Sequence, residues 1–241
     1  MSEARRRAYL EAMGIPVWLP RGPTEPPEAP AAGVAVEPST QGDALDVSMP
    51  SAGGEVAAMD WRALREEILG CTRCGLCESR TQAVPGVGSV EADLLVIGEA
   101  PGQEEDRQGE PFVGRAGQLL DRMLAAIGFD RQTVFITNVL KCRPPNNRDP
   151  APEEVHACTP YLRRQIELIA PRVILSVGRI SAQNLLETPS TLGRLRGSWH
   201  RFGPRETPLR VTYHPAYLLR NPAAKRQAWD DLKRVRDQLR E

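Results

Sequence analysis

Three short motifs with polar side chains each follow an apolar, strand-like run of the sequence. They occupy residues 98–102 (GEAPG), 137–145 (TNVLKCRPP) and 214–220 (HPAYLLR). Within them, Glu99, Asn138 and His214 offer a carboxylate, an amide and an imidazole, which together can bind a polar ligand and move protons. Because the carboxyl ends of parallel strands meet at one edge of a sheet, we expect the three motifs to form parts of one pocket.

Four of the five cysteines are spaced as a metal or cluster site. Cys71 and Cys74 form a CxxC pair, which by itself is equally compatible with redox chemistry or zinc. Cys142 follows after 67 intervening residues and Cys158 after another 15. A zinc ribbon more often closes with a second tight pair, whereas an iron-sulfur cluster tolerates wide spacing, so the spacing favours a cluster and leaves zinc open. We interpret Cys77 as a small buried or half-buried thiol that is not a ligand.

The elements that must position these residues begin at Trp61, where apolar runs of strand length alternate with helical periodicity. Strands are predicted at residues 93–97, 134–139, 173–177 and 210–213, with a hairpin around 199–202. Helices are predicted at residues 61–69, 119–127, 153–170, 180–186 and 223–239. This alternation predicts an α/β fold of three layers, α/β/α, around a central, mostly parallel four-stranded sheet.

The chain divides by composition into three parts. Residues 1–20 form a short apolar and basic motif, residues 21–58 are an acidic linker rich in Pro and Ala, and residues 59–241 are predicted to fold as one domain. The linker has no apolar period, so we expect disorder there. The apolar side chains within residues 5–19 indicate either a frayed terminus or a motif that binds a protein partner.

The formal net charge is zero, but the charges are unevenly distributed. No basic residue lies between Arg21 and Arg62, whereas 27 basic and 22 acidic residues follow Asp60. The predicted domain is therefore mildly basic, which permits contact with phosphate. No run approaches the roughly 18 apolar residues of a membrane span, and the five cysteines come without an export signal. We expect a cytoplasmic protein with no membrane partner.

Together, the motifs and the four cysteines resemble the iron-sulfur (family 4, or type-4) uracil-DNA glycosylases over about residues 71–239. The resemblance implies the uracil-DNA glycosylase fold, DNA as the partner, and a monomeric DNA-repair enzyme. Such an enzyme flips uracil out of DNA and hydrolyses its N-glycosidic bond, which leaves an abasic site. It also implies a 4Fe-4S cluster held by Cys71, Cys74, Cys142 and Cys158. We expect this cluster to be structural, with redox signalling as the alternative.

The resemblance assigns three residues to the uracil pocket. Phe112 would form its flat wall, and Asn138 would read the base edge. The amide oxygen of Asn138 can accept the uracil N3–H while its nitrogen donates to O4, whereas cytosine presents the reverse pattern. His214 would donate to uracil O2, where negative charge develops as the base departs. Ala100 and Asn147 also match positions of the family.

The residue that activates water is less directly indicated. Ala100 stands where the classical uracil glycosylases carry an aspartate, and Glu99 and Glu105 are the candidates to replace that carboxylate. Glu105 could instead shape the pocket near uracil C5. The chain shows no long inserted loop with a histidine after the second predicted strand, of the kind that traps DNA covalently. We therefore expect a monofunctional glycosylase that turns over by hydrolysis.

The third motif also resembles the loop that probes the DNA minor groove. Leu218 or Leu219 would fill the gap left by the flipped nucleotide, and Arg220 would meet a phosphate. Lys141 and Arg143 are expected at the DNA-facing edge, next to the cluster. Two other functions stay open at this point: a non-catalytic iron-sulfur protein that binds DNA, and an adaptor of replication or repair.

Overall fold

The computed structural model describes residues 53–241. The motif predicted at residues 1–20 and most of the predicted linker, with their expected disorder and protein partner, lie outside the described residues. The linker boundary at residue 58 is corrected, because Gly53–Ala58 forms helix α2. Val56 of this helix is buried with Leu64, Ile68 and Tyr161 in a small apolar cluster. This packing stabilises the short helix.

The centre of the fold is a six-stranded sheet in the order β1-β3-β2-β4-β6-β5. Its strands are β1 (Val87–Gly88), β2 (Leu94–Gly98), β3 (Phe135–Asn138), β4 (Val173–Val177), β5 (Trp199–Phe202) and β6 (Thr207–Thr212). The four predicted strands are confirmed, and β3, β2, β4 and β6 are mutually parallel. The short edge strands β1 and β5 pair antiparallel and extend the four to six.

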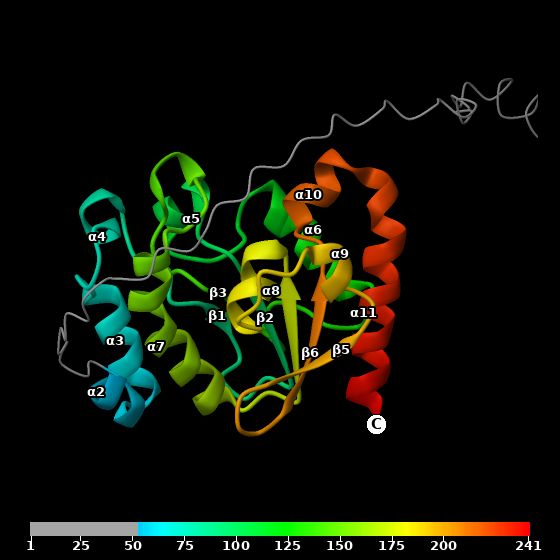
Figure 1. Ribbon diagram of the computed structural model, residues 1–241, viewed down its shortest axis with the longest axis horizontal. Helices are drawn as coiled ribbons and strands as arrows, with labels where there is room; N and C mark the ends of the chain where they lie inside the picture. The colour runs from blue at the N-terminus through cyan, green and yellow to red at the C-terminus, as the bar shows by residue number, and fades with distance from the viewer. Residues whose placement is uncertain (1–52) are drawn as a thin grey trace, which may run out of the picture. The chain divides into compact units, whose positions relative to one another are not determined.

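Helices cover both faces of this sheet, which confirms the three-layer α/β/α architecture (Figure 1). The longer helices are α3 (Trp61–Gly70), α6 (Arg115–Ala125), α7 (Pro152–Ile169), α8 (Arg179–Leu185) and α11 (Lys225–Arg240). The short ones are α4 (Leu76–Ser79), α5 (Gln103–Gln108), α9 (Leu192–Leu195) and α10 (Pro215–Arg220). Two 3₁₀ turns lie at Pro145–Asn147 and Pro222–Ala224.

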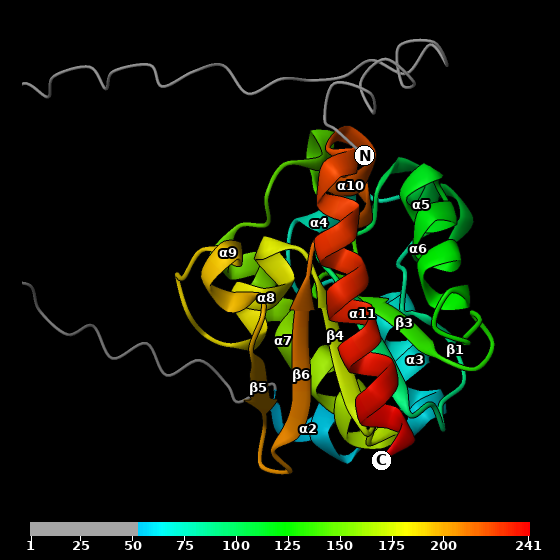
Figure 2. The same ribbon diagram turned by 90° about the vertical axis from the view of Figure 1, so that its right-hand side faces the viewer.

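The alternation of side chains along each strand builds two separate cores. Leu94, Val96 and Leu175 point to one face and pack with α6 and α11, and Figure 2 shows α11 lying along β4 and β6. Leu95 and Ile174 point to the other face and pack with α7 and α8. Because both faces are covered, β2 and β4 are apolar except for Ser176, whose buried hydroxyl is hydrogen-bonded to that of Ser181.

The parallel arrangement brings the carboxyl ends of β2, β3, β4 and β6 to one edge of the sheet. All three motifs start there, and α10 follows β6 at the same end of the molecule (Figure 1). Within residues 53–241, no helix is both long and apolar enough to cross a bilayer.

Candidate active site

A cavity of about 480 Å³ opens at the carboxyl ends of the parallel strands. It brings together eight of the residues that the sequence predicted for the site: Glu99, Ala100, Glu105, Phe112, Asn138, Asn147, His214 and Arg220. They come from all three motifs and from the segment that joins β2 to α6. The expectation of one shared pocket is therefore met by the geometry.

Asn138 ends β3 and presents a buried acceptor to the cavity. The residue is 2% exposed, and its Oδ1 has no hydrogen-bond partner among the described residues. Its main chain is fixed, because its carbonyl accepts from Nζ of Lys141 at 2.6 Å and it pairs in register with Gly98 of β2. A buried acceptor without a partner costs about 1–3 kcal/mol. Such an atom at the wall of a cavity is suited to a ligand that donates a hydrogen bond.

Phe112 forms an apolar wall of the cavity. Its backbone has φ of 55°, which is unusual for a residue other than glycine and turns the ring inward. Arg131 holds this conformation, since its guanidinium donates to the carbonyl oxygens of Pro111 at 2.6 Å and of Phe112 at 3.0 Å. The ring centroid lies 5.6 Å from that of His214, with 30° between the ring planes. A flat ligand can therefore contact both rings.

His214 caps the start of α10 and keeps one ring nitrogen for the cavity. Its Nδ1 accepts from the backbone N–H of Ala216 at 3.1 Å. Burial, together with the positive charge of Arg220, lowers the pKa of His214 to about 4, although Glu105 opposes this effect. The ring is therefore neutral near pH 7, with its proton on Nε2. Nε2 is then a hydrogen-bond donor.

Glu105 uses both carboxylate oxygens to hold the walls of the cavity. Oε1 accepts from the backbone N–H groups of Val113 and Gly114 at 2.9 and 3.0 Å, and Oε2 accepts from that of Gly102 at 3.1 Å. These bonds join the loop after β2 to the loop that carries Phe112. Of the two candidate carboxylates, Glu105 is thus the one committed to main-chain contacts.

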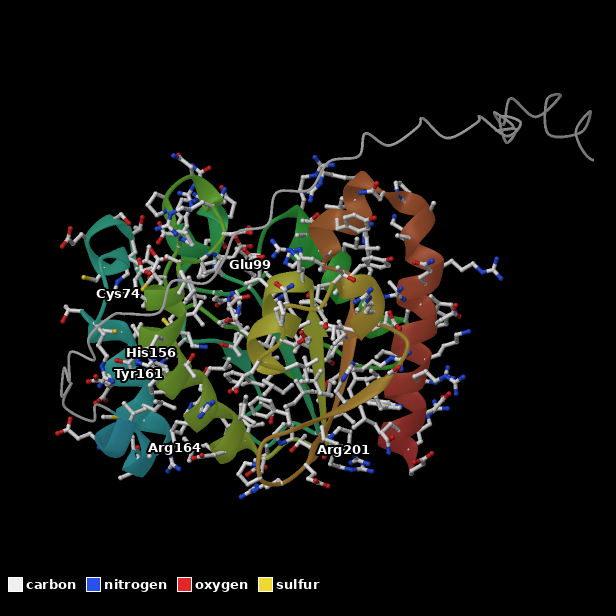
Figure 3. All side chains as sticks on the ribbon, viewed as in Figure 1. Cys74, Glu99, His156, Tyr161, Arg164 and Arg201 are labelled. Carbon is white, nitrogen blue, oxygen red and sulfur yellow. The ribbon has the colours of Figure 1, made fainter. Side chains whose placement is uncertain are left out.

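Glu99 lines the same cavity in a different environment. It lies at the strand ends, as Figure 3 shows. Burial and the nearby carboxylate of Asp149 raise its pKa, Arg179 opposes them, and the net result is a pKa of about 7. Asp149 and Arg179 form an ion pair of 2.6 Å between Oδ2 and a guanidinium nitrogen. Glu99 therefore exchanges its proton near neutral pH, as a general base should.

Asn147 and Arg143 lie in the turn that follows β3. Nε of Arg143 donates to Oδ1 of Asn147 at 2.8 Å, and Asn147 has φ of 53°. This bond fixes the amide at the mouth of the cavity. Lys141, expected beside Arg143 at the DNA-facing edge, is instead buried, and its ammonium group donates to Oγ1 of Thr137 at 2.8 Å and to Asn138. That expectation is corrected, and the lysine positions the end of β3.

Helix α10 separates the two leucines that the sequence could not distinguish. Leu218 is 1% exposed and packs in the core with α6 and α11, so its assignment as a DNA-contacting wedge is corrected. Leu219 is 38% exposed and Arg220 is exposed. Because successive residues of a helix point in different directions, only Leu219 of the pair reaches the surface.

Three of the four cysteines predicted as ligands share one apolar cluster, against which Ala100 of the cavity packs, whereas Cys71 packs against the cluster of Val56, Leu64 and Ile68. Cys142 and Cys158 are buried with Leu76 and Leu140, and Cys74 packs against this group. Burial raises the pKa of the Cys142 thiol, and Cys74 and Cys71 add to this effect. A guanidinium nitrogen of Arg80, which lowers the pKa, donates to the sulfur of Cys142 at 3.0 Å. Figure 3 shows Cys74 next to one end of α7.

This donor set fits an iron-sulfur cluster in its chemistry, since Cys74, Cys142 and Cys158 share an apolar shell, Cys71 acts on Cys142 through space, and Arg80 donates to the sulfur of Cys142. As the side chains are placed, residues 53–241 contain no group of three or more His, Cys, Asp or Glu side chains arranged around a single ion position. The fifth cysteine, Cys77, is half-buried, and its backbone N–H donates to the carbonyl of Cys74.

Comparison with known proteins gives the family. Residues 85–233 match the family model described as the uracil DNA glycosylase superfamily. The type-4 uracil-DNA glycosylase of Archaeoglobus fulgidus is 48% identical over 176 residues, which cover 70% of this chain and 88% of the relative. That of Pyrobaculum aerophilum is 47% identical over 180 residues, covering 72% and 92%. The chain belongs to the type-4 uracil-DNA glycosylase family. The resemblance found in the motifs is confirmed.

Several residues that support the pocket of this type-4 family member carried no signal in the sequence. Arg131, in the segment between α6 and β3, holds the Phe112 loop, and Arg179, at the start of α8, acts on Glu99 through space. Neither residue lies within one of the three motifs. Lys141 does lie within a motif, but nothing in the local sequence indicates that its side chain turns inward.

Proposed function

We propose that this chain is a uracil-DNA glycosylase of base excision repair. It flips uracil out of DNA and hydrolyses the N-glycosidic bond, leaving an abasic site. The observation that carries the proposal is the buried Oδ1 of Asn138, which has no hydrogen-bond partner in the described part of the chain and belongs to the same cavity as Phe112 and His214. The names of the type-4 relatives support the substrate and the reaction.

Base recognition falls to Asn138 and Phe112. Oδ1 accepts the uracil N3–H, the amide nitrogen donates to O4, and the ring of Phe112 covers one face of the base. Cytosine has an acceptor at N3 and an amino group at C4. Its N3 would face the amide oxygen, which is also an acceptor, and its amino group would face the amide nitrogen, which is also a donor. Each unpaired buried group costs about 1–3 kcal/mol, which is enough to reject cytosine strongly.

Bond cleavage relies on His214. When the bond between uracil N1 and C1′ breaks, its electron pair stays on the base and the negative charge spreads to O2. The Nε2–H of the neutral ring donates to O2 and stabilises this charge. The bond from Ala216 to Nδ1 keeps the proton on the correct nitrogen.

Water completes the reaction at C1′. Its oxygen forms the new bond to the sugar, and its proton passes to the carboxylate of Glu99, which is available when that group is ionised. We assign Glu105 a positioning role, because three backbone N–H groups already occupy its oxygens. Ala100 leaves space at the cavity where a larger side chain would stand.

DNA contact is assigned to Leu219, Arg220 and Arg143. Leu219 would enter the gap left by the extruded nucleotide, and the two arginines would meet phosphates. Cys71, Cys74, Cys142 and Cys158 would hold a 4Fe-4S cluster, which would cross-link the turn between α3 and α4, the segment after β3 and α7. Zinc is the less favoured occupant.

The test is excision from an oligonucleotide that carries a single uracil, revealed by alkaline strand cleavage. The wild type, Asn138→Ala and His214→Ala are compared on single and double strands, with Cys77→Ala as the matched control. Loss of two hydrogen bonds predicts a decrease of about 10²-fold or more in kcat/KM for Asn138→Ala. No excision by the folded wild type would refute the glycosylase and favour a binding or adaptor role.

A further inference from the structure

Three side chains form a stack that ends at the rim of the cavity, and we call it the stacked column. The guanidinium carbon of Arg196 lies 4.3 Å from the ring centroid of Tyr213. The ring of Tyr213 lies 4.9 Å from that of Tyr217, with 18° between their planes. Tyr217 is 38% exposed and lines the cavity together with Asn138. The column therefore runs from Arg196 to the rim of the cavity.

The stacked column is anchored in the interior. Asp231, which is buried, accepts from Nε and a terminal nitrogen of Arg196 at 2.9 and 2.6 Å, and it also accepts from Arg210. The hydroxyl of Tyr213 donates to Oε1 of Gln227 at 2.9 Å. Arg196 and Tyr213 are thus fixed by polar contacts, and the ring of Tyr217 stacks on this rigid support. The Tyr217 ring is therefore ordered before a ligand binds, so binding loses less conformational entropy.

The column ends where an extended nucleic acid would pass. Tyr217 lies three residues after His214, and Arg220 follows at the next turn of α10. An aromatic face beside a cation is the pattern with which proteins hold single-stranded nucleic acid, because bases stack on the ring while the cation meets the backbone. Leu219, on the same short helix, is exposed at a different angle.

We propose that Tyr217 stacks on the nucleobase directly adjoining the extruded uracil, with Tyr213 and Arg196 as its support. The inference rests on the proposed function and extends it by one subsite. Uracil leaves the strand when it enters the cavity, so its neighbour loses a stacking partner. The exposed face of Tyr217 replaces that partner. The subsite accepts any base, since every base has a flat π-face.

The test uses the full chain and short single-stranded oligonucleotides with one tetrahydrofuran residue, which mimics the abasic product and does not react. Tyr217→Ala should bind it about 5- to 150-fold more weakly than wild type at fixed salt, and Tyr217→Phe should stay within about twofold. Trp229→Ala, which removes an equally exposed aromatic outside the column, is the matched control.

Two further oligonucleotides test whether a base beside the tetrahydrofuran residue stacks on Tyr217. Each lacks one base beside the tetrahydrofuran residue, on one side or the other. If Tyr217 stacks on a neighbouring base, the effect of Tyr217→Ala should disappear on one of these oligonucleotides. Equal affinity of Tyr217→Ala and wild type overturns the proposal, as does an effect that persists on both. Uracil excision by wild type is measured separately, so failure of the glycosylase and failure of the stacking subsite give different results.

Discussion

Nδ1 of His214 accepts a hydrogen bond from the backbone N–H of Ala216 at 3.1 Å, so the neutral imidazole carries its proton on Nε2. The pKa of the ring, lowered to about 4, keeps it neutral over the whole range in which the protein would work. The ring therefore acts as a fixed donor, and the pH dependence of excision must come from another group.

Glu99 should set the pH profile. We predict that kcat/KM rises about tenfold per pH unit below pH 7 and levels off above it, because the pKa of Glu99 is raised to about 7 and only the carboxylate can accept a proton from water. Single-turnover rates from pH 5 to 9 check this. Glu99→Gln should flatten the profile and lower the plateau by about 10²–10⁴-fold. A near-full rate in this variant would show that no carboxylate activates water.

The two charged neighbours of Glu99 should shift the midpoint of the pH profile in opposite directions. Asp149 raises the pKa of Glu99 and Arg179 lowers it. Asp149→Asn should therefore shift the midpoint of the pH profile to lower pH, and Arg179→Gln should shift it to higher pH. The pair serve as controls for each other, since both changes break the same surface ion pair. Shifts in the same direction would mean that Glu99 is not the titrating group.

Glu99 should also make stability depend on pH. Below about pH 4.5 the group is protonated in the folded and unfolded chain, but between 4.5 and 7 only the folded chain keeps its proton. Stability from this group therefore falls as pH rises and is lost above about 7. We predict that Glu99→Gln raises Tm relative to wild type at pH 8 and leaves it nearly unchanged at pH 4.5. A constant difference in Tm at the two pH values would contradict this.

Gly98 should tolerate no side chain. A Cβ there would collide with Oδ1 of Asn138 and lie 2.6 Å from Cζ of Phe112. We predict that Gly98→Ala costs about 1–3 kcal/mol in free energy of unfolding and lowers the excision rate by about tenfold or more, because it displaces the atoms that we propose hold uracil. Gly193→Ala in α9, where a Cβ meets nothing within 4 Å, is the control. Urea denaturation and excision rates measure both.

We expect four of the cysteines to be cluster ligands and Cys77 not to be one. Cys142→Ala should abolish the brown colour of the purified protein and its visible absorbance, since it removes one of four proposed ligands and the partner of Arg80. Cys77→Ala should keep both the absorbance and the Tm. Unchanged melting of a colourless Cys142→Ala protein would reject a structural role for the cluster, and a colourless Cys77→Ala protein would reassign the ligand.

Much of the fold was predictable because it follows from local patterns. Apolar runs at residues 93–97, 134–139 and 173–177 are bounded by turn residues, and they correspond to β2, β3 and β4. The short edge strand β1 was not predicted, since two residues carry no period. Helix α2 was assigned to the linker, because the sequence there shows no apolar period. Among residues 55–58, whose burial the structure describes, only Val56 is buried.

The sequence by itself determined that the three motifs meet at one site, because motifs that follow parallel strands converge at one edge of the sheet. Only the tertiary structure decided what each side chain does there. It buried Leu218 and exposed Leu219, committed Glu105 to three backbone N–H groups, and left Oδ1 of Asn138 without a hydrogen-bond partner within residues 53–241. The physical reason is that local propensity decides where strands and helices form along the chain. The direction, burial and hydrogen bonding of each side chain depend instead on neighbours that are distant in sequence.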